Sequence, residues 1–128
     1  MSGNHGEATD LVAMLATMTT STAVGLDLVE VVGELIAEDA RFNKWVFSRK
    51  ADSTAVELWN LAALASKHAE GCTFAWNAFL AASGESRHTK YRELVELLRG
   101  YRAHLQEIRQ TGVVDFRDPD MPAELLEL

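Results

Sequence analysis

Histidine and cysteine, two side chains that bind transition metals, occur four residues apart at His68 and Cys72. In a helix this spacing places both on one face, where they could hold the same ion. A closed zinc site needs two more ligands, for which His104 and Asp39 are the candidates from other helices. Burial in the core is the commoner role, because cysteine is among the most buried side chains. We therefore predict no metal and no cofactor, and keep His68 and Cys72 as the candidate ligands of a metal-dependent enzyme.

A row of carboxylates follows one side of the helix predicted over about residues 27–48. Steps of three, four and four residues separate its members, Asp27, Glu30, Glu34 and Glu38. Residues 1–40 contain no Lys or Arg that would neutralise them. A solvated helix face is the ordinary interpretation, and an acidic surface that meets a basic partner is the functional one. We assign Glu30, Glu34 and Glu38 to a partner-binding surface.

Cations and aromatic rings alternate in the ten residues that follow this acidic region. The cations are Arg41, Lys44, Arg49 and Lys50, and the rings are Phe42, Trp45 and Phe47. Surfaces that neutralise phosphates and stack bases have this composition. Helical spacing places two or three of the rings on the core side, and cations near a helix end are also favoured by its dipole. The four cations are therefore candidate nucleic-acid contacts.

Arginines form an edge along the last long predicted helix, at Arg92, Arg99, Arg102 and Arg109. Seven- and three-residue steps keep them on one sector of the helix surface. Arginine makes forked contacts with carboxylates and phosphates, so this edge is a candidate docking surface for a protein or a nucleic acid. Pairing with glutamates of the same helix is the structural alternative.

Helices must position all of these residues. The two prolines, Pro119 and Pro122, both lie in the last ten residues, so no obligatory helix breaker precedes them. We predict helices over about residues 10–18, 27–48, 54–83 and 89–110, then a short C-terminal helix. The start signals are Thr9 for the first helix, Thr54 with Glu57 for the third and Thr89 for the fourth. Gly112 is the stop signal of the fourth helix. Gly71 leaves open whether residues 54–83 are one helix or two, and we favour one.

The last of these helices carries a heptad-like apolar seam, formed by Tyr91, Leu94, Leu98, Tyr101, Leu105 and Ile108. Packing inside a bundle is the expected use of so short a seam, with a homodimer through it as the alternative. In the helix over 27–48 the apolar stripe skips one position, which directs Asp39 toward the interior. Trp59 and the leucines Leu125, Leu126 and Leu128 are further candidate anchors for a partner.

Length and composition indicate one small domain. The 128 residues are 48% hydrophobic and 24% charged, with a net charge of -7. We divide them into a tail (1–8), a helical bundle (9–112), and a linker with a short helix (113–128). The one cysteine and the lack of a secretory pattern at the start favour the cytoplasm, and no apolar run approaches the length of a membrane span.

The sequence therefore predicts an all-α bundle of four main helices with a short C-terminal helix. Its favoured function is that of a small non-enzymatic interaction protein, such as an adaptor, regulatory subunit or inhibitor. The first alternative is a nucleic-acid-contacting subunit of a nucleoprotein complex. The second is the metal-dependent enzyme. An acidic total charge disfavours nonspecific nucleic-acid binding but leaves room for a local basic surface.

Overall fold

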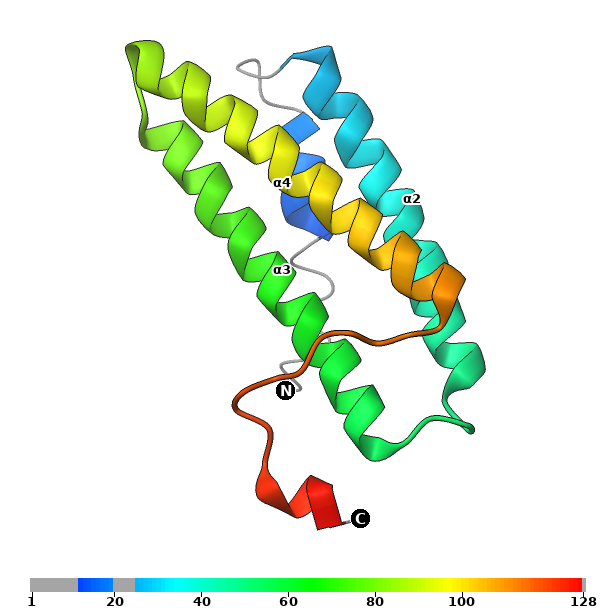
Figure 1. The fold of residues 1–128 in the computed structure, drawn as a ribbon. Helices are drawn as coiled ribbons and strands as arrows, with labels where there is room; N and C mark the ends of the chain where they lie inside the picture. The colour runs from blue at the N-terminus through cyan, green and yellow to red at the C-terminus, as the bar shows by residue number, and fades with distance from the viewer. Residues whose placement is uncertain (1–11, 20–24, 128) are drawn as a thin grey trace.

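The computed structural model describes residues 12–19 and 25–127, and most of them are helical (Figure 1). A helical segment at residues 12–19 precedes three long helices, α2 (Leu26–Arg49), α3 (Ala55–Ala81) and α4 (Gly84–Thr111), and the 3-10 helix η1 (Ala123–Glu127) comes last. The described residues contain no strand, so the predicted all-α fold is confirmed. No described helix has the length and apolarity that a membrane crossing requires. The predicted tail at 1–8 and the cap at Thr9 lie outside the described residues.

Helix α3 begins with the capping box that the sequence predicts. The Thr54 hydroxyl accepts a hydrogen bond from the Glu57 backbone N–H at 3.1 Å, and the Glu57 carboxylate accepts one from the Thr54 N–H at 3.4 Å. These two bonds satisfy donors that a helix start leaves unpaired. The helix then runs through Gly71 without a break, so residues 55–81 form one helix.

Helix α4 starts earlier than predicted. It begins at Gly84 rather than after Thr89, whose hydroxyl donates to the Glu85 carbonyl within the first turns. Gly84 has a φ of 61°, which lets the chain turn tightly out of α3, and the residues between 85 and 89 are all compatible with a helix. The predicted stop is confirmed, because Gly112 adopts a φ of 74° and its N–H bonds the Ile108 carbonyl at 2.7 Å.

Helix α4 is the central helix of the bundle and packs against both α2 and α3 (Figure 1). Its predicted apolar seam is core, with Leu94, Leu98, Tyr101, Leu105 and Ile108 all buried. The segment 12–19 lies behind α4 in Figure 1, and its Leu15 and Met18 are fully buried. Because these seam residues are buried within one chain, they pack inside the bundle as expected and are not exposed for pairing with a second copy.

The residues after α4 run back across α3 (Figure 1). We call residues 112–122 the C-terminal strap. Alternate residues of the strap, Val114, Phe116 and Asp118, are partly buried, whereas their neighbours are exposed. This is the pattern of an extended chain with one face on the protein. Val114, Phe116 and Asp118 therefore pack the strap on the bundle.

Candidate functional site

A buried ion pair joins α2 to α4. Arg109 donates from Nε to Glu38 Oε2 at 2.8 Å and from Nη2 to Oε1 at 3.1 Å. Glu38 is 1% exposed and accepts a third bond from Arg41 at 3.4 Å. The Arg109 hydrogen bond lowers the pKa of the Glu38 carboxyl and so keeps it ionised. The prediction that Glu38 lies on an exposed acidic face is wrong, because α4 covers this side of α2.

A second, exposed pair joins the same two helices one turn away on α2 and two turns away on α4. Glu34 and Arg102 are 3.7 Å apart, and the Glu34 side chain is 54% exposed. We call Glu34, Glu38, Arg102 and Arg109 the charged seam. The acidic row of α2 and the arginine edge of α4, predicted as two binding surfaces, therefore face each other and are partly neutralised within the chain.

Other predicted site residues of these helices remain in solvent. Glu30, Arg92 and Arg99 are exposed, and no ion pair is found for them within the described part of the chain. Asp39, predicted to point inward, is half-buried and accepts a hydrogen bond from Asn43. Burial raises the pKa of Asp39. These three exposed side chains are accessible to a partner without rearrangement.

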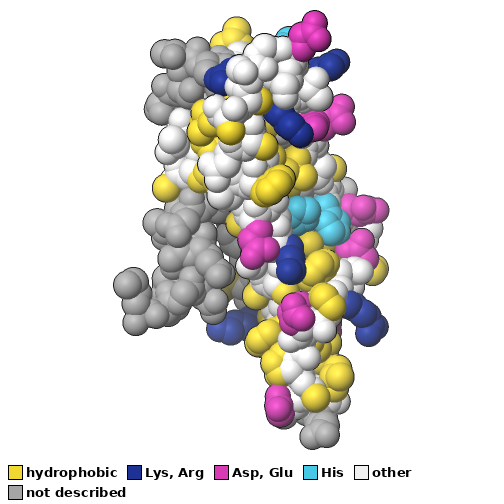
Figure 2. Space-filling view, turned by 90° about the vertical axis from the view of Figure 1, so that its left-hand side faces the viewer, with side chains coloured by type: hydrophobic (Ala, Val, Ile, Leu, Met, Phe, Trp, Pro, Cys, Tyr) yellow, Lys and Arg dark blue, Asp and Glu magenta, His cyan; other side chains and the backbone are white. Residues whose placement is uncertain are grey.

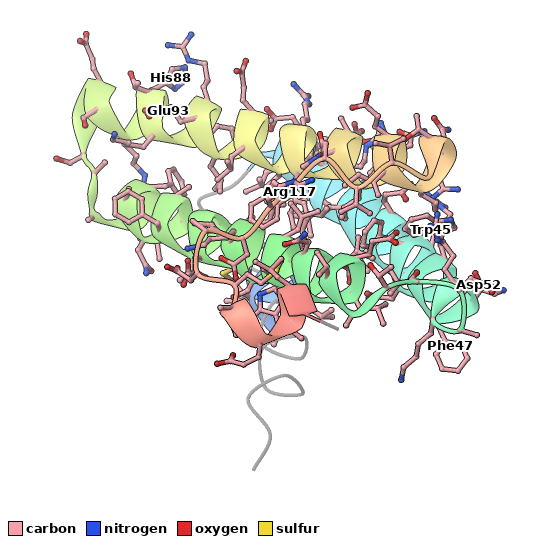
Figure 3. The ribbon with its side chains drawn as sticks, turned by 60° about the horizontal axis from the view of Figure 1, so that its bottom comes forward. Trp45, Phe47, Asp52, His88, Glu93 and Arg117 are labelled. Atoms are coloured by element: carbon pink, nitrogen blue, oxygen red, sulfur yellow. The ribbon has the colours of Figure 1, made fainter. Side chains whose placement is uncertain are left out.

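The cations near the end of α2 differ in their contacts, because Arg49 has partners within the chain and two lysines are exposed. Arg49 lies 4.6 Å from the Trp45 ring centre, donates to the Gly112 carbonyl at 3.4 Å and is 3.6 Å from Glu57. It therefore links the C-terminus of α2 to the start of α3 and the end of α4, which lie at the same end of the bundle. Lys44 and Lys50 are exposed with no ion pair among the described residues, and Phe47, 78% exposed, points away from the helices (Figure 3).

An open groove of about 530 Å³ lies beside the charged seam. Val29, Gly33 and Ala37 recur along α2 at one-turn spacing and form its apolar part. A Cβ atom added at Gly33 would meet nothing within 4 Å, so the groove is open there. The charged residues that line it are Glu30, Glu34, Arg41 and Arg102. Four of the predicted contact residues thus border one concave surface.

A chain of titratable side chains crosses the other side of α4. His68 Nε2 on α3 lies 3.2 Å from His104 Nδ1 on α4, and His104 Nε2 lies 2.8 Å from Asp115 Oδ1 on the strap. The His68 ring stacks on Tyr101, with centres 4.0 Å apart and planes at 11°. We call His68, Tyr101, His104 and Asp115 the histidine seam. Histidines come to the surface next to acidic side chains at mid-height in Figure 2.

The structure brings His68 to His104 but leaves Cys72 out of this arrangement. Cys72 is fully buried, and burial raises the pKa of its thiol to about 12, so it is neither a thiolate nor accessible. Burial also raises the pKa of Tyr101, whose hydroxyl has no hydrogen-bond partner among the described residues. The predicted metal pair of His68 and Cys72 is therefore corrected: Cys72 belongs to the core.

The anchors of the strap were missed in the sequence. Trp59 Nε1 donates to Asp118 Oδ2 at 2.8 Å, and the Asp118 backbone N–H donates to the buried amide oxygen of Asn60 at 2.9 Å. The Trp59 hydrogen bond lowers the pKa of Asp118. Trp59 is thus engaged within the chain, and of the leucine anchors Leu126 is exposed while Leu128 lies outside the described residues. The alternation of apolar and polar residues at 114–117 was the available signal.

These arrangements can be compared with those of known proteins. No family model, no curated protein and no solved structure matches the chain, so its own geometry must carry the functional argument.

Proposed function

We propose that this chain is a small, non-enzymatic cytoplasmic interaction protein whose α2–α4 groove binds a helix of a protein partner. The observation that carries the proposal is the groove itself, which combines an open apolar strip at Val29, Gly33 and Ala37 with charged residues along its borders. Amphipathic helices bind in grooves of this kind through residues one turn apart.

The shape of the groove favours a helix as occupant. Small residues at one-turn spacing let a second helix approach the backbone of α2 closely. Gly33 offers no side chain at all at the centre of this strip, and a Cβ atom built there would contact no other side chain within 4 Å. A flat or convex partner would leave this hollow unfilled.

The charges of the groove specify the partner further. Glu30 lies toward the start of α2 and Arg41 toward its end, with the exposed Glu34–Arg102 pair between them. A complementary helix carries a basic residue opposite Glu30 and an acidic residue opposite Arg41. Because an exposed ion pair contributes little stability, Glu34 and Arg102 can exchange partners at low cost when the helix binds.

The experiment uses two matched glycines. A photoreactive side chain at Ala37 is crosslinked in extract of the native cell, and the attached peptide is identified by mass spectrometry. Gly33→Leu fills the groove and should abolish the crosslink. Gly100→Leu is the control, because a Cβ at Gly100 on α4 also meets nothing within 4 Å but lies outside the groove. Neither change removes a packing contact.

Support requires a crosslinked peptide with helical periodicity and a basic residue, lost with Gly33→Leu and with Glu30→Lys but retained with Gly100→Leu. A crosslink that survives Gly33→Leu, or the same products from a probe placed at Gly100, would rule out the groove as the binding site.

A second candidate, contact with single-stranded nucleic acid, rests on the exposed Phe47 between Lys44 and Lys50. An aromatic ring flanked by unpaired cations can stack a base and neutralise phosphates. Fluorescence anisotropy with an oligonucleotide tests it. Affinity that falls about tenfold from low to moderate salt, and is lost in the Lys44→Glu/Lys50→Glu variant, favours this candidate. Absence of binding at low salt eliminates it.

A further inference from the structure

The histidine seam is separate from the proposed partner groove and has no role in it. Its two rings approach through nitrogen atoms rather than through carbon edges, with His68 Nε2 and His104 Nδ1 3.2 Å apart. The ring planes meet at 72° and the ring centres are 5.4 Å apart. Two imidazole nitrogens directed at each other share either a proton or a metal ion. The distance between the nitrogens and the groups that contact each ring determine what the pair can bind.

The spacing suits a tetrahedral metal ion. Zinc binds histidine nitrogens at about 2.0–2.1 Å, which holds two nitrogens of one tetrahedron roughly 3.3 Å apart. The observed separation of 3.2 Å is close to this value, so the helices need not move to admit an ion. The change required is a tilt of the two rings, which turns both lone pairs toward a common point.

Neighbouring groups contact both rings and limit the orientations that they can take. His68 is stacked on Tyr101 with centres 4.0 Å apart, and His104 is bonded through Nε2 to Asp115 at 2.8 Å. Metal-binding histidines usually give their second N–H to a carboxylate in this way, which fixes the tautomer and raises the basicity of the ligand. Asp115 therefore leaves Nδ1 of His104 as the lone-pair nitrogen that faces His68.

Protonation does not oppose a ligand role for His68. Burial and the nearby His104 ring lower the pKa of His68 to about 4, so its imidazole is neutral at neutral pH. Its one proton lies on Nε2 when it donates to His104, and exchange with solvent can move it to Nδ1, which frees Nε2 without a change of net charge. The His104 side chain is 26% exposed, so an ion can reach the pair from solvent.

We propose that His68 Nε2 and His104 Nδ1 bind one divalent transition-metal ion of the zinc class, which crosslinks α3 to α4. Among the described residues no three of His, Cys, Asp or Glu surround a common point, so water completes the coordination. Such a site is weaker than a closed four-ligand site and is independent of the partner groove. Imidazole ligands favour zinc over magnesium or calcium.

Isothermal titration of the full chain with Zn²⁺ tests the proposal, together with the zinc-dependent change in melting temperature. We expect one ion per chain and a higher melting temperature for the wild type. His68→Gln and His104→Gln should each lose binding, and Asp115→Asn should weaken it about 10- to 100-fold. The His5→Gln/His88→Gln variant removes the other two histidines and should bind as the wild type does.

A ring-nitrogen NMR spectrum of the wild type keeps the test decisive if a histidine variant fails to fold. Zn²⁺ should shift Nε2 of His68 and Nδ1 of His104 and leave the ring of His88 unchanged. Absence of zinc binding would show that the pair is only hydrogen-bonded. Undiminished binding in both single variants, or loss of binding in the His5→Gln/His88→Gln variant, would place the ion elsewhere and overturn the proposal.

Discussion

Helix α4 carries two polar seams that differ in how their charges are satisfied. On the α2 side, Glu38 is fully buried but accepts three hydrogen bonds from arginines, so its charge is compensated within the chain. On the α3 side, the His68 ring is neutral at neutral pH, and the Tyr101 hydroxyl lacks a hydrogen-bond partner among the described residues. The charged seam therefore holds two helices together through compensated charges, whereas the histidine seam is the proposed metal site.

The largest effect is expected within the charged seam itself, from two glutamates one turn apart. Glu38→Gln removes a buried carboxylate that pairs with arginine and should lower the free energy of unfolding by about 2 kcal/mol. Glu34→Gln alters an exposed pair and should change it by less than about 0.5 kcal/mol. Urea unfolding measures both. Equal effects would show that burial does not distinguish the two pairs.

The two seams should also lose stability in different pH ranges. The pKa of His68 is about 4 in the folded chain, against an ordinary value of 6.5, so the unfolded chain gains a proton first as pH falls. Stability from a neutral His68 is present above pH 6.5 and is lost between about 6.5 and 4. The pKa of Glu38 is lowered from 4.5, so its contribution is lost only below that value.

Unfolding free energies across this pH range provide the measurement. His68→Gln should flatten the plot of unfolding free energy against pH only between about 6.5 and 4. Glu38→Gln should flatten it only below 4.5. A His68→Gln variant with the wild-type slope between pH 6.5 and 4 would contradict the assignment of that range to the histidine seam.

A smaller and local effect is expected at the strap that covers the α3 side. Trp59→Phe removes the hydrogen bond to Asp118 while it keeps an aromatic ring in place. Hydrogen exchange of the strap amides, that of Asp118 included, should become faster, whereas exchange in the core of α4 should stay nearly unchanged. Unaltered exchange in the strap would mean that its other contacts, including the one to Asn60, hold it without the Trp59 hydrogen bond.

A small effect of the opposite sign is expected at Tyr101. Its ring packs on His68, but its hydroxyl is buried without a hydrogen-bond partner among the described residues. Tyr101→Phe keeps the ring and removes the uncompensated polar group, so the stability should stay the same or rise by up to about 1 kcal/mol. A loss of more than about 1 kcal/mol in urea unfolding would reveal a hydroxyl contact outside the described residues.

Local sequence determined most of the helical structure. The capping box at Thr54 and Glu57, the stop at Gly112 and the apolar period of α4 depend on residues within a few positions of one another. Such signals act through backbone hydrogen bonds and one helix face, so they can be found without knowledge of the fold. The one start that was misplaced, at Thr89, has no breaker between it and Gly84 that would hold the helix to the later position.

The candidate sites were only partly predictable. The sequence identified Glu38, Arg109, His68 and His104 by type, and it assigned the first two to separate surfaces. The sequence named His104 as a candidate partner of His68 and Cys72. Only the tertiary structure joined Glu38 to Arg109, selected His104 rather than Cys72 as the contact of His68, and laid Asp115 of the strap beside His104. The spacing within one helix fixes which residues share a face, whereas the rotation and crossing of two helices are set by side-chain packing over their whole length.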